Sequence, residues 1–143
     1  MKATLNWDGG MAFSGKTESG HLVLLDAGPE SGGENKGPRP PEVLLHAAAV
    51  CTGMDIVYVL EKMRLKIDKF FIEIEGIRAT EHPKRFTEMS IIYHINGKLP
   101  EDKVKRAIKL SSETYCTVVH SINAKVQYKY SLNEEPVKKM ESL

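Results

Sequence analysis

The chain has 143 residues, which is long enough to bury a hydrophobic core and predicts a single domain covering residues 1–143. Apolar residues make up 41% of the sequence, charged residues 27%, and the net charge is +1. This balance gives no electrostatic reason to expect nucleic acid or an anionic membrane as a partner. The N-terminus lacks the apolar stretch of a signal peptide and no transmembrane run is evident, so we expect a cytoplasmic protein.

The first part of the chain, residues 1–27, has the pattern of a three-stranded β meander. Polar and apolar residues alternate in the first segment, and glycine-containing turns follow the first and second segments. The three predicted strands cover residues 2–7, 11–16 and 21–27.

Residues 28–41 form a loop rich in glycine and proline. Most of this loop is expected to be a flexible linker, because it contains no apolar side chain other than proline. The loop nevertheless brings Arg39 to the start of the next element, and long loops inside compact domains are often functional.

The stretch from Pro41 to Arg64 is predicted to be a helix that is apolar on nearly all sides. A helix of this kind is normally buried, so we expect a second subunit to supply part of its cover in a homodimer. Two groups in the helix are unusual for a plain core, the thiol of Cys51 and, one turn later, the carboxylate of Asp55. A buried acid usually has a partner, so the helix is expected to carry a site.

Residues 42–132 complete a helix–strand core, and residues 133–143 are a charged tail that is expected to fray. Strands are predicted at residues 67–78, 86–95 and 125–132, with an amphipathic helix from Pro100 and a more apolar helical segment after a break near 111–114. This order predicts an α+β fold, an antiparallel sheet with its helices gathered on one face.

The two cysteines, Cys51 and Cys116, admit several interpretations. On residue type alone, two small buried hydrophobic side chains are favoured. A zinc site would recruit His120, four positions after Cys116, but His46 is rotated by about 140° from Cys51 on a helix, so no convergent third ligand is evident. No metal and no cofactor are therefore predicted. The remaining possibility is a pair of thiols that meet in space, one attacking a peroxide and the other resolving the sulfenic acid as a disulfide.

Two segments around these cysteines resemble the OsmC/Ohr family, the osmotically inducible protein C and organic hydroperoxide resistance proteins. They are PPEVLLHAAAVCTGMD (Pro40–Asp55) and SSETYCTV (Ser111–Val118), and the order of strands and helices agrees over nearly the whole chain. The resemblance implies an OsmC-like fold and an intertwined homodimer with two active sites at the interface. It implies that Cys51 is the peroxidatic and Cys116 the resolving cysteine, with organic hydroperoxides as substrates and a dithiol reductant such as a dihydrolipoyl protein.

The sequence departs from the Ohr pattern where the reactive thiol would be activated. No arginine follows the glycines of the first hairpin, and Pro41 stands where Ohr-type members have a glutamate. Glu42 lies about 180° round the helix from Cys51 and roughly a dozen ångströms away, so a plain first-turn acid is the simpler interpretation. Arg39 is the candidate replacement for the missing arginine, since the OsmC branch of the family draws its arginine from such a loop. Asp55 would oppose a thiolate by its charge alone, but could hold a guanidinium against the sulfur.

Two functions of different classes are compatible with the sequence. The first is a cysteine-based peroxidase for organic hydroperoxides. The second is a non-catalytic OsmC-like dimer that binds an apolar ligand at the subunit interface. Thiol titration before and after peroxide treatment separates them.

Overall fold

The computed structural model describes residues 1–141, and its contacts divide the chain into two compact units, Met1–Leu44 and the part from Leu45 onward. The predicted tail extends to residue 143, and its last two residues lie outside the described part of the chain.

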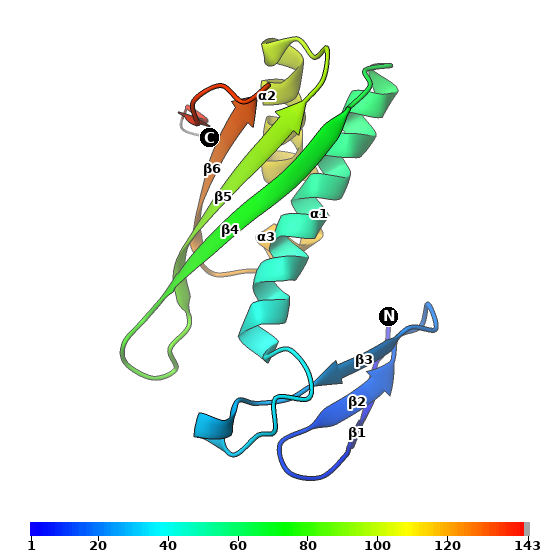
Figure 1. Cartoon of the computed structure of the whole chain (residues 1–143), viewed down its shortest axis with the longest axis vertical. Coiled ribbons are helices and arrows are strands. Elements are labelled where there is room, and N and C mark those ends of the chain that lie inside the picture. Colours follow the sequence, from blue (N-terminus) through cyan, green and yellow to red (C-terminus); the bar gives the residue numbers. More distant parts are fainter. Residues whose placement is uncertain (142–143) are drawn as a thin grey trace. The chain divides into compact units, whose positions relative to one another are not determined.

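The unit Met1–Leu44 contains the predicted meander (Figure 1). Its three antiparallel strands are β1 (Thr4–Trp7), β2 (Phe13–Lys16) and β3 (Leu22–Leu25), in the sheet order β1-β2-β3. The first turn uses glycines with positive φ, as the sequence predicted. In the loop between β3 and the central helix, the one element of regular secondary structure is a short 3₁₀ turn, η1 (Pro29–Ser31).

The predicted central helix is α1 (Pro40–Lys62), 23 residues long. From Leu45 onward it belongs to the second unit, where Ile56 and Leu60 are fully buried in the core. Gly53 is also buried, and a Cβ at this position would come within 2.6 Å of Ile72 Cδ1. The absence of a side chain therefore lets the helix pack closely on the strand that carries Ile72.

The described residues of the second unit leave the opposite side of α1 uncovered. Val50, Met54 and Tyr58 follow one another at intervals of four residues, which places them on one face, and their side chains are 49%, 67% and 55% exposed. The prediction of a buried helix thus holds for one face, while the other presents an apolar stripe to solvent.

Among the described residues, α1 is also the one helix long and apolar enough to cross a membrane by length and composition. The core helix of a soluble protein meets the same criteria, and α1 contributes buried side chains to the core of the second unit.

The second unit is built on a four-stranded sheet with the order β4-β5-β6-β7. Its strands are β4 (Lys69–Arg78), β5 (Phe86–Asn96), β6 (Lys125–Leu132) and β7 (Lys138–Lys139). The two-residue strand β7 lies in the segment that the sequence analysis treated as a fraying tail, so that expectation is wrong at this point. It pairs with β6, which ties this part of the tail to the sheet.

The connection between β5 and β6 consists of α2 (Glu101–Leu110), a π-helical turn η2 (Ser111–Tyr115) and α3 (Thr117–His120). The predicted break between two helices is thus a π turn that directly continues α2. This crossover returns the chain to the starting end of β5, so β6 pairs with β5 in parallel and the sheet is not antiparallel throughout. The α+β class is confirmed.

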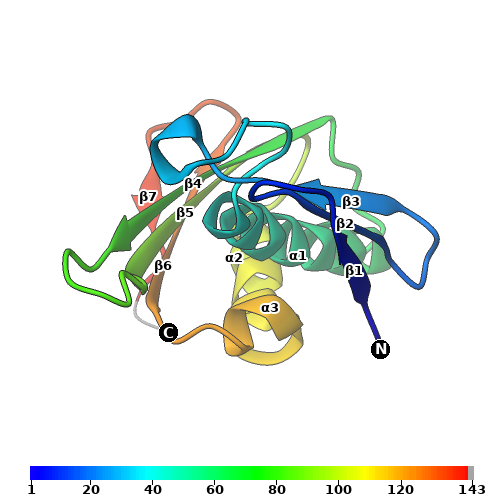
Figure 2. The ribbon, with the colours of Figure 1, turned by 90° about the horizontal axis from the view of Figure 1, so that it is seen from below.

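The core of the second unit lies between this sheet and its helices, which occupy one face (Figure 2). Alternate residues of β5 point into it, including Ile91, Tyr93 and Ile95, as expected for a strand with one buried face. Val104 and Ile108 of α2 pack against the same cluster.

Candidate dithiol site

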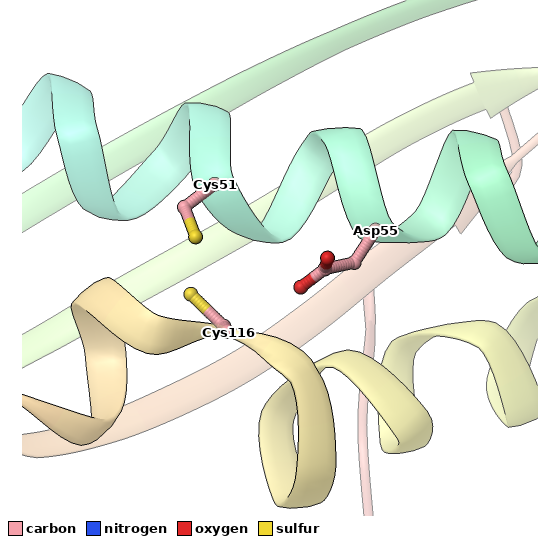
Figure 3. Close-up of side chains that lie close together, drawn as sticks. All are labelled: Cys51, Asp55 and Cys116. Atoms are coloured by element: carbon pink, nitrogen blue, oxygen red, sulfur yellow. The ribbon is translucent and has the colours of Figure 1, made fainter.

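Cys51, Asp55 and Cys116 come together in the second unit (Figure 3). Cys51 and Asp55 lie one turn apart on α1, while Cys116 is the N-cap residue of α3. One ligand atom from each residue, the two Sγ atoms and a carboxylate oxygen, lies within 4.8 Å of the others. The fold therefore brings together two cysteines that are far apart in the sequence.

Ser111 fastens the crossover to α1. Its buried hydroxyl donates a hydrogen bond of 2.8 Å to Asp55 Oδ2, and its carbonyl oxygen accepts one of 3.0 Å from the Cys116 N–H. The π turn thus links the acid on α1 to the position of the second sulfur. Ser111 was not predicted as a site residue, although it lies in the segment that carried the family resemblance. A serine five positions before the cysteine is the signal that could have identified it.

The two thiols have different surroundings. Cys116 is completely buried, whereas Cys51 is half-buried. Burial raises the pKa of the Cys116 thiol to about 12, and the nearby Cys51 and Asp55 contribute to the same rise. The Val119 N–H donates a hydrogen bond of 3.4 Å to Cys116 Sγ, and this bond partly offsets the rise in pKa. Cys116 is therefore a protonated thiol at neutral pH, which leaves Cys51 as the candidate nucleophile.

Tyr93 of β5 places a phenol near these groups. Burial raises the pKa of Tyr93, and the charges of Cys116 and Asp55 contribute, while the nearby Thr52 hydroxyl opposes the rise. Thr52 itself donates to the carbonyl oxygens of Ala48 and Ala49. The Tyr93 hydroxyl is buried, and none of the described residues, including the nearby Thr52, forms a hydrogen bond of good geometry with it.

The histidines considered for a zinc site are not part of the cluster. His120 Nδ1 lies 2.8 Å from the Cys116 carbonyl oxygen, a contact in which the ring N–H donates to the backbone, and the side chain is exposed. His46 is exposed on α1 and is likewise outside the group of converging ligand atoms. The third group beside the two sulfurs is instead the Asp55 carboxylate.

Arg39 and Glu42 belong to the other unit, Met1–Leu44, and they contact one another. The guanidinium lies 3.4 Å from Glu42 Oε1 and 3.4 Å from Glu30 Oε1. The Arg39 N–H also donates to Glu42 Oε2 at 2.8 Å, at the start of α1. Glu42 is therefore more than the plain first-turn acid expected from the sequence, because it also binds the arginine.

The fold and the converging side chains define an α+β protein with a paired-thiol site between its central helix and a crossover connection. The family model for OsmC-like proteins matches residues 33–131, and the chain belongs to this family.

Several proteins are similar to this chain over most of its length. Protein YhfA of Escherichia coli K12 is 33% identical over 92% of this chain and 96% of its own. A hypothetical protein from Aquifex aeolicus VF5 is 31% identical, with a TM-score of 0.76 over 93% of this chain and 97% of its own. An organic hydroperoxide resistance protein from Elizabethkingia anophelis is 17% identical, with a TM-score of 0.69 over 92% and 94% of the two chains, and shares the fold.

Proposed function

We propose that this protein is a cysteine-based peroxidase that reduces organic hydroperoxides with Cys51 and Cys116. The observation that carries the proposal is the approach of the two sulfur atoms to within 4.8 Å. The known hydroperoxide resistance proteins with this fold support the choice of substrate class.

In the proposed reaction, the Cys51 thiolate attacks the terminal oxygen of the hydroperoxide. The O–O bond breaks, the alcohol leaves after gaining a proton, and Cys51 becomes a sulfenic acid. The Cys116 sulfur then attacks the Cys51 sulfur, and water leaves as the disulfide forms. An external dithiol, for which a dihydrolipoyl protein is the candidate, returns both residues to thiols and is itself oxidised to a disulfide.

The surroundings of the two thiols support this assignment of roles. Cys51 is held on a long helix and is partly accessible, whereas Cys116 is buried at the end of a π turn. A buried thiol with a raised pKa is a poor first nucleophile. It can act once Cys51 has been oxidised, since the attack then takes place within the protein.

Three charged residues are proposed to support the thiols. Asp55 positions Cys116, since it accepts the Ser111 hydrogen bond that fixes the π turn. Arg39 supplies the cation that stabilises the reactive thiolate, and both Glu42 and Glu30 contact its guanidinium. The arginine would replace the Ohr-type arginine that the sequence lacks, and Glu42 contributes little because Glu30 makes a similar contact.

We further propose a homodimer in which a second copy covers the apolar stripe formed by Val50, Met54 and Tyr58. The stripe borders an open groove of about 440 Å³ that also includes Phe70 and Ile72. Exposed apolar surface of this kind marks an interaction site. Light scattering at micromolar concentration is expected to give twice the chain mass of 16.0 kDa, and a folded monomer would contradict the proposal. We place the dimer in the cytoplasm.

The peroxidase is tested by treating reduced protein with cumene hydroperoxide and measuring its intact mass. Wild-type protein is expected to lose the mass of two hydrogens as the disulfide forms. Cys116→Ser is expected to gain two oxygens as Cys51 reaches the sulfinic acid, and Cys51→Ser to remain unchanged. If wild-type protein keeps both thiols under excess peroxide, the peroxidase proposal fails. The apolar groove then supports the alternative, a non-catalytic dimer that binds an apolar ligand at the interface.

A further inference from the structure

The dithiol site has the donor set and spacing of a metal site, a property that peroxide reduction does not use. Cys51 and Asp55 are at positions i and i+4 of one helix, which places both side chains on the same face, and Cys116 approaches from a separate element. The sequence provided no third ligand beside the two thiols, and the fold provides Asp55.

The distances are compatible with a tetrahedral ion. Zinc–sulfur bonds of about 2.3 Å and zinc–oxygen bonds of about 2.1 Å place neighbouring ligand atoms about 3.6–3.8 Å apart. The three ligand atoms of this site lie within 4.8 Å of one another, so a contraction of about 1 Å at most is required. Rotation of the side chains can supply such a shift.

The charges of the site favour a cation. Asp55 is half-buried, and no basic side chain within Leu45–Glu141 forms an ion pair with it. A partly buried carboxylate beside two sulfur atoms is a suitable ligand for a cation.

Two further residues complete the surroundings of such a site. Ser111 donates to Asp55 Oδ2, which orients the carboxylate and leaves Oδ1 as a ligand atom. The buried Tyr93 hydroxyl lacks a partner within the described chain and lies near Asp55 and Cys116. It is a further polar group in the surroundings of the proposed ligands.

We propose that the reduced site binds one thiophilic divalent cation, such as Zn²⁺, through Cys51 Sγ, Cys116 Sγ and one oxygen of Asp55. The fourth position is taken by water. The two thiol protons are released, and no electron is transferred. The ion and the peroxide compete for the same sulfur atoms, so occupancy by zinc blocks disulfide formation. Metal binding does not depend on the proposed peroxidase activity, because an inactive protein would retain the same ligands.

The test is an anaerobic titration of the reduced full-length protein with Co²⁺, followed by Zn²⁺. Wild-type protein is expected to bind one equivalent, with the thiolate charge-transfer band and visible bands of tetrahedral cobalt, and zinc is expected to remove both. Asp55→Asn is expected to weaken binding by about tenfold or more, and each cysteine-to-serine variant by more. The matched control is Asp68→Asn, an exposed acid of the same unit, which is expected to bind as the wild type does.

Circular dichroism establishes that each variant is folded, and a second measurement requires no variant. One equivalent of zinc is expected to protect both thiols of the wild type from an alkylating reagent. The proposal is overturned if the wild type lacks the charge-transfer band, if zinc gives no protection, or if Asp55→Asn binds as tightly as Asp68→Asn. A wild-type protein that binds cobalt but does not react with peroxide would refute the proposed peroxidase and leave the metal site standing.

Discussion

Two clusters of charged and polar groups, one in each compact unit, have opposite compositions. In the first, the Arg39 guanidinium lies between the carboxylates of Glu30 and Glu42 on an exposed surface. In the second, the Asp55 carboxylate lies beside two thiols and is held by a buried serine, and no basic side chain among residues 45–141 forms an ion pair with it. The difference between the clusters illustrates how burial changes the contribution of a polar contact to stability. The exposed ion pairs are screened by water, whereas the hydrogen bond from the buried Ser111 hydroxyl is largely shielded from it on the serine side.

The largest effect on stability is expected from removal of the buried contact. Ser111→Ala leaves Asp55 Oδ2 without its donor and is expected to lower the free energy of unfolding by about 1–3 kcal/mol. Glu30→Gln, which breaks an exposed ion pair of the first cluster, is expected to cost less than about 1 kcal/mol. Urea unfolding of both variants measures the difference. Equal losses of unfolding free energy in the two variants would show that the contacts of the two clusters contribute equally to stability.

The first cluster is expected to matter for reactivity instead. Arg39→Ala removes the cation proposed to stabilise the Cys51 thiolate, and we expect the rate of reaction with cumene hydroperoxide to fall about tenfold. Glu42→Gln leaves Glu30 to hold the guanidinium, so its rate is expected to change little. Stopped-flow measurement of the first turnover tests both variants. An unchanged rate in Arg39→Ala would remove this arginine from the mechanism, and a complete loss in Glu42→Gln would reverse the roles of the pair.

The second cluster is expected to lose stability in alkali. The raised pKa of Cys116, about 12 against an ordinary value of 9.0, means that the folded protein retains a proton that the unfolded chain releases. Its contribution is complete below pH 9 and is lost as the pH rises toward 12, with a slope of at most about 1.4 kcal/mol per pH unit. In Cys116→Ser the free energy of unfolding is expected to fall less steeply between pH 9 and 10. This window lies below the ordinary tyrosine pKa of 10.0, so the titration of tyrosines contributes little to it. Identical slopes for the two proteins would contradict this.

The smallest expected effect is that of the Asp55 charge on peroxide reactivity. Asp55→Asn retains an oxygen that accepts the Ser111 hydrogen bond and removes a negative charge beside both sulfurs. Because that charge opposes a thiolate, the rate at neutral pH is expected to rise about threefold. A fall in the rate would mean that the carboxylate holds a cation against Cys51.

The local elements could be predicted because their signals lie within short segments. Alternation of apolar residues identified the strands, and the run of apolar residues from Pro41 identified the central helix. The parallel pairing of β5 with β6 was missed because alternation reveals a strand but not its direction. The strand Lys138–Lys139 was missed because two lysines carry no strand signal and are placed by their pairing with β6.

The site was predictable to the extent that the family resemblance marked the two cysteines. Asp55 was identified from its position one turn after Cys51, with a guanidinium as one candidate partner, whereas the hydrogen bond from Ser111 was not predicted. The serine could not be assigned from periodicity, because a π turn shifts the helical phase after α2. Exposure of Met54 also could not be read from the sequence, since an apolar helix looks the same whether its own chain or a second copy covers it.

The crossover between β5 and β6 has a consequence for folding kinetics. It carries Cys116, so the two thiols meet only when the chain between Cys51 and Cys116 has closed into a long loop that includes β4 and β5. Such non-local contacts form slowly, because the entropy of loop closure is lost before the contact is gained. Oxidative trapping of the Cys51–Cys116 pair during refolding would therefore act as a clock for closure of the crossover. A chain stalled before that step would expose a peroxide-sensitive Cys51 that has no second thiol to rescue it.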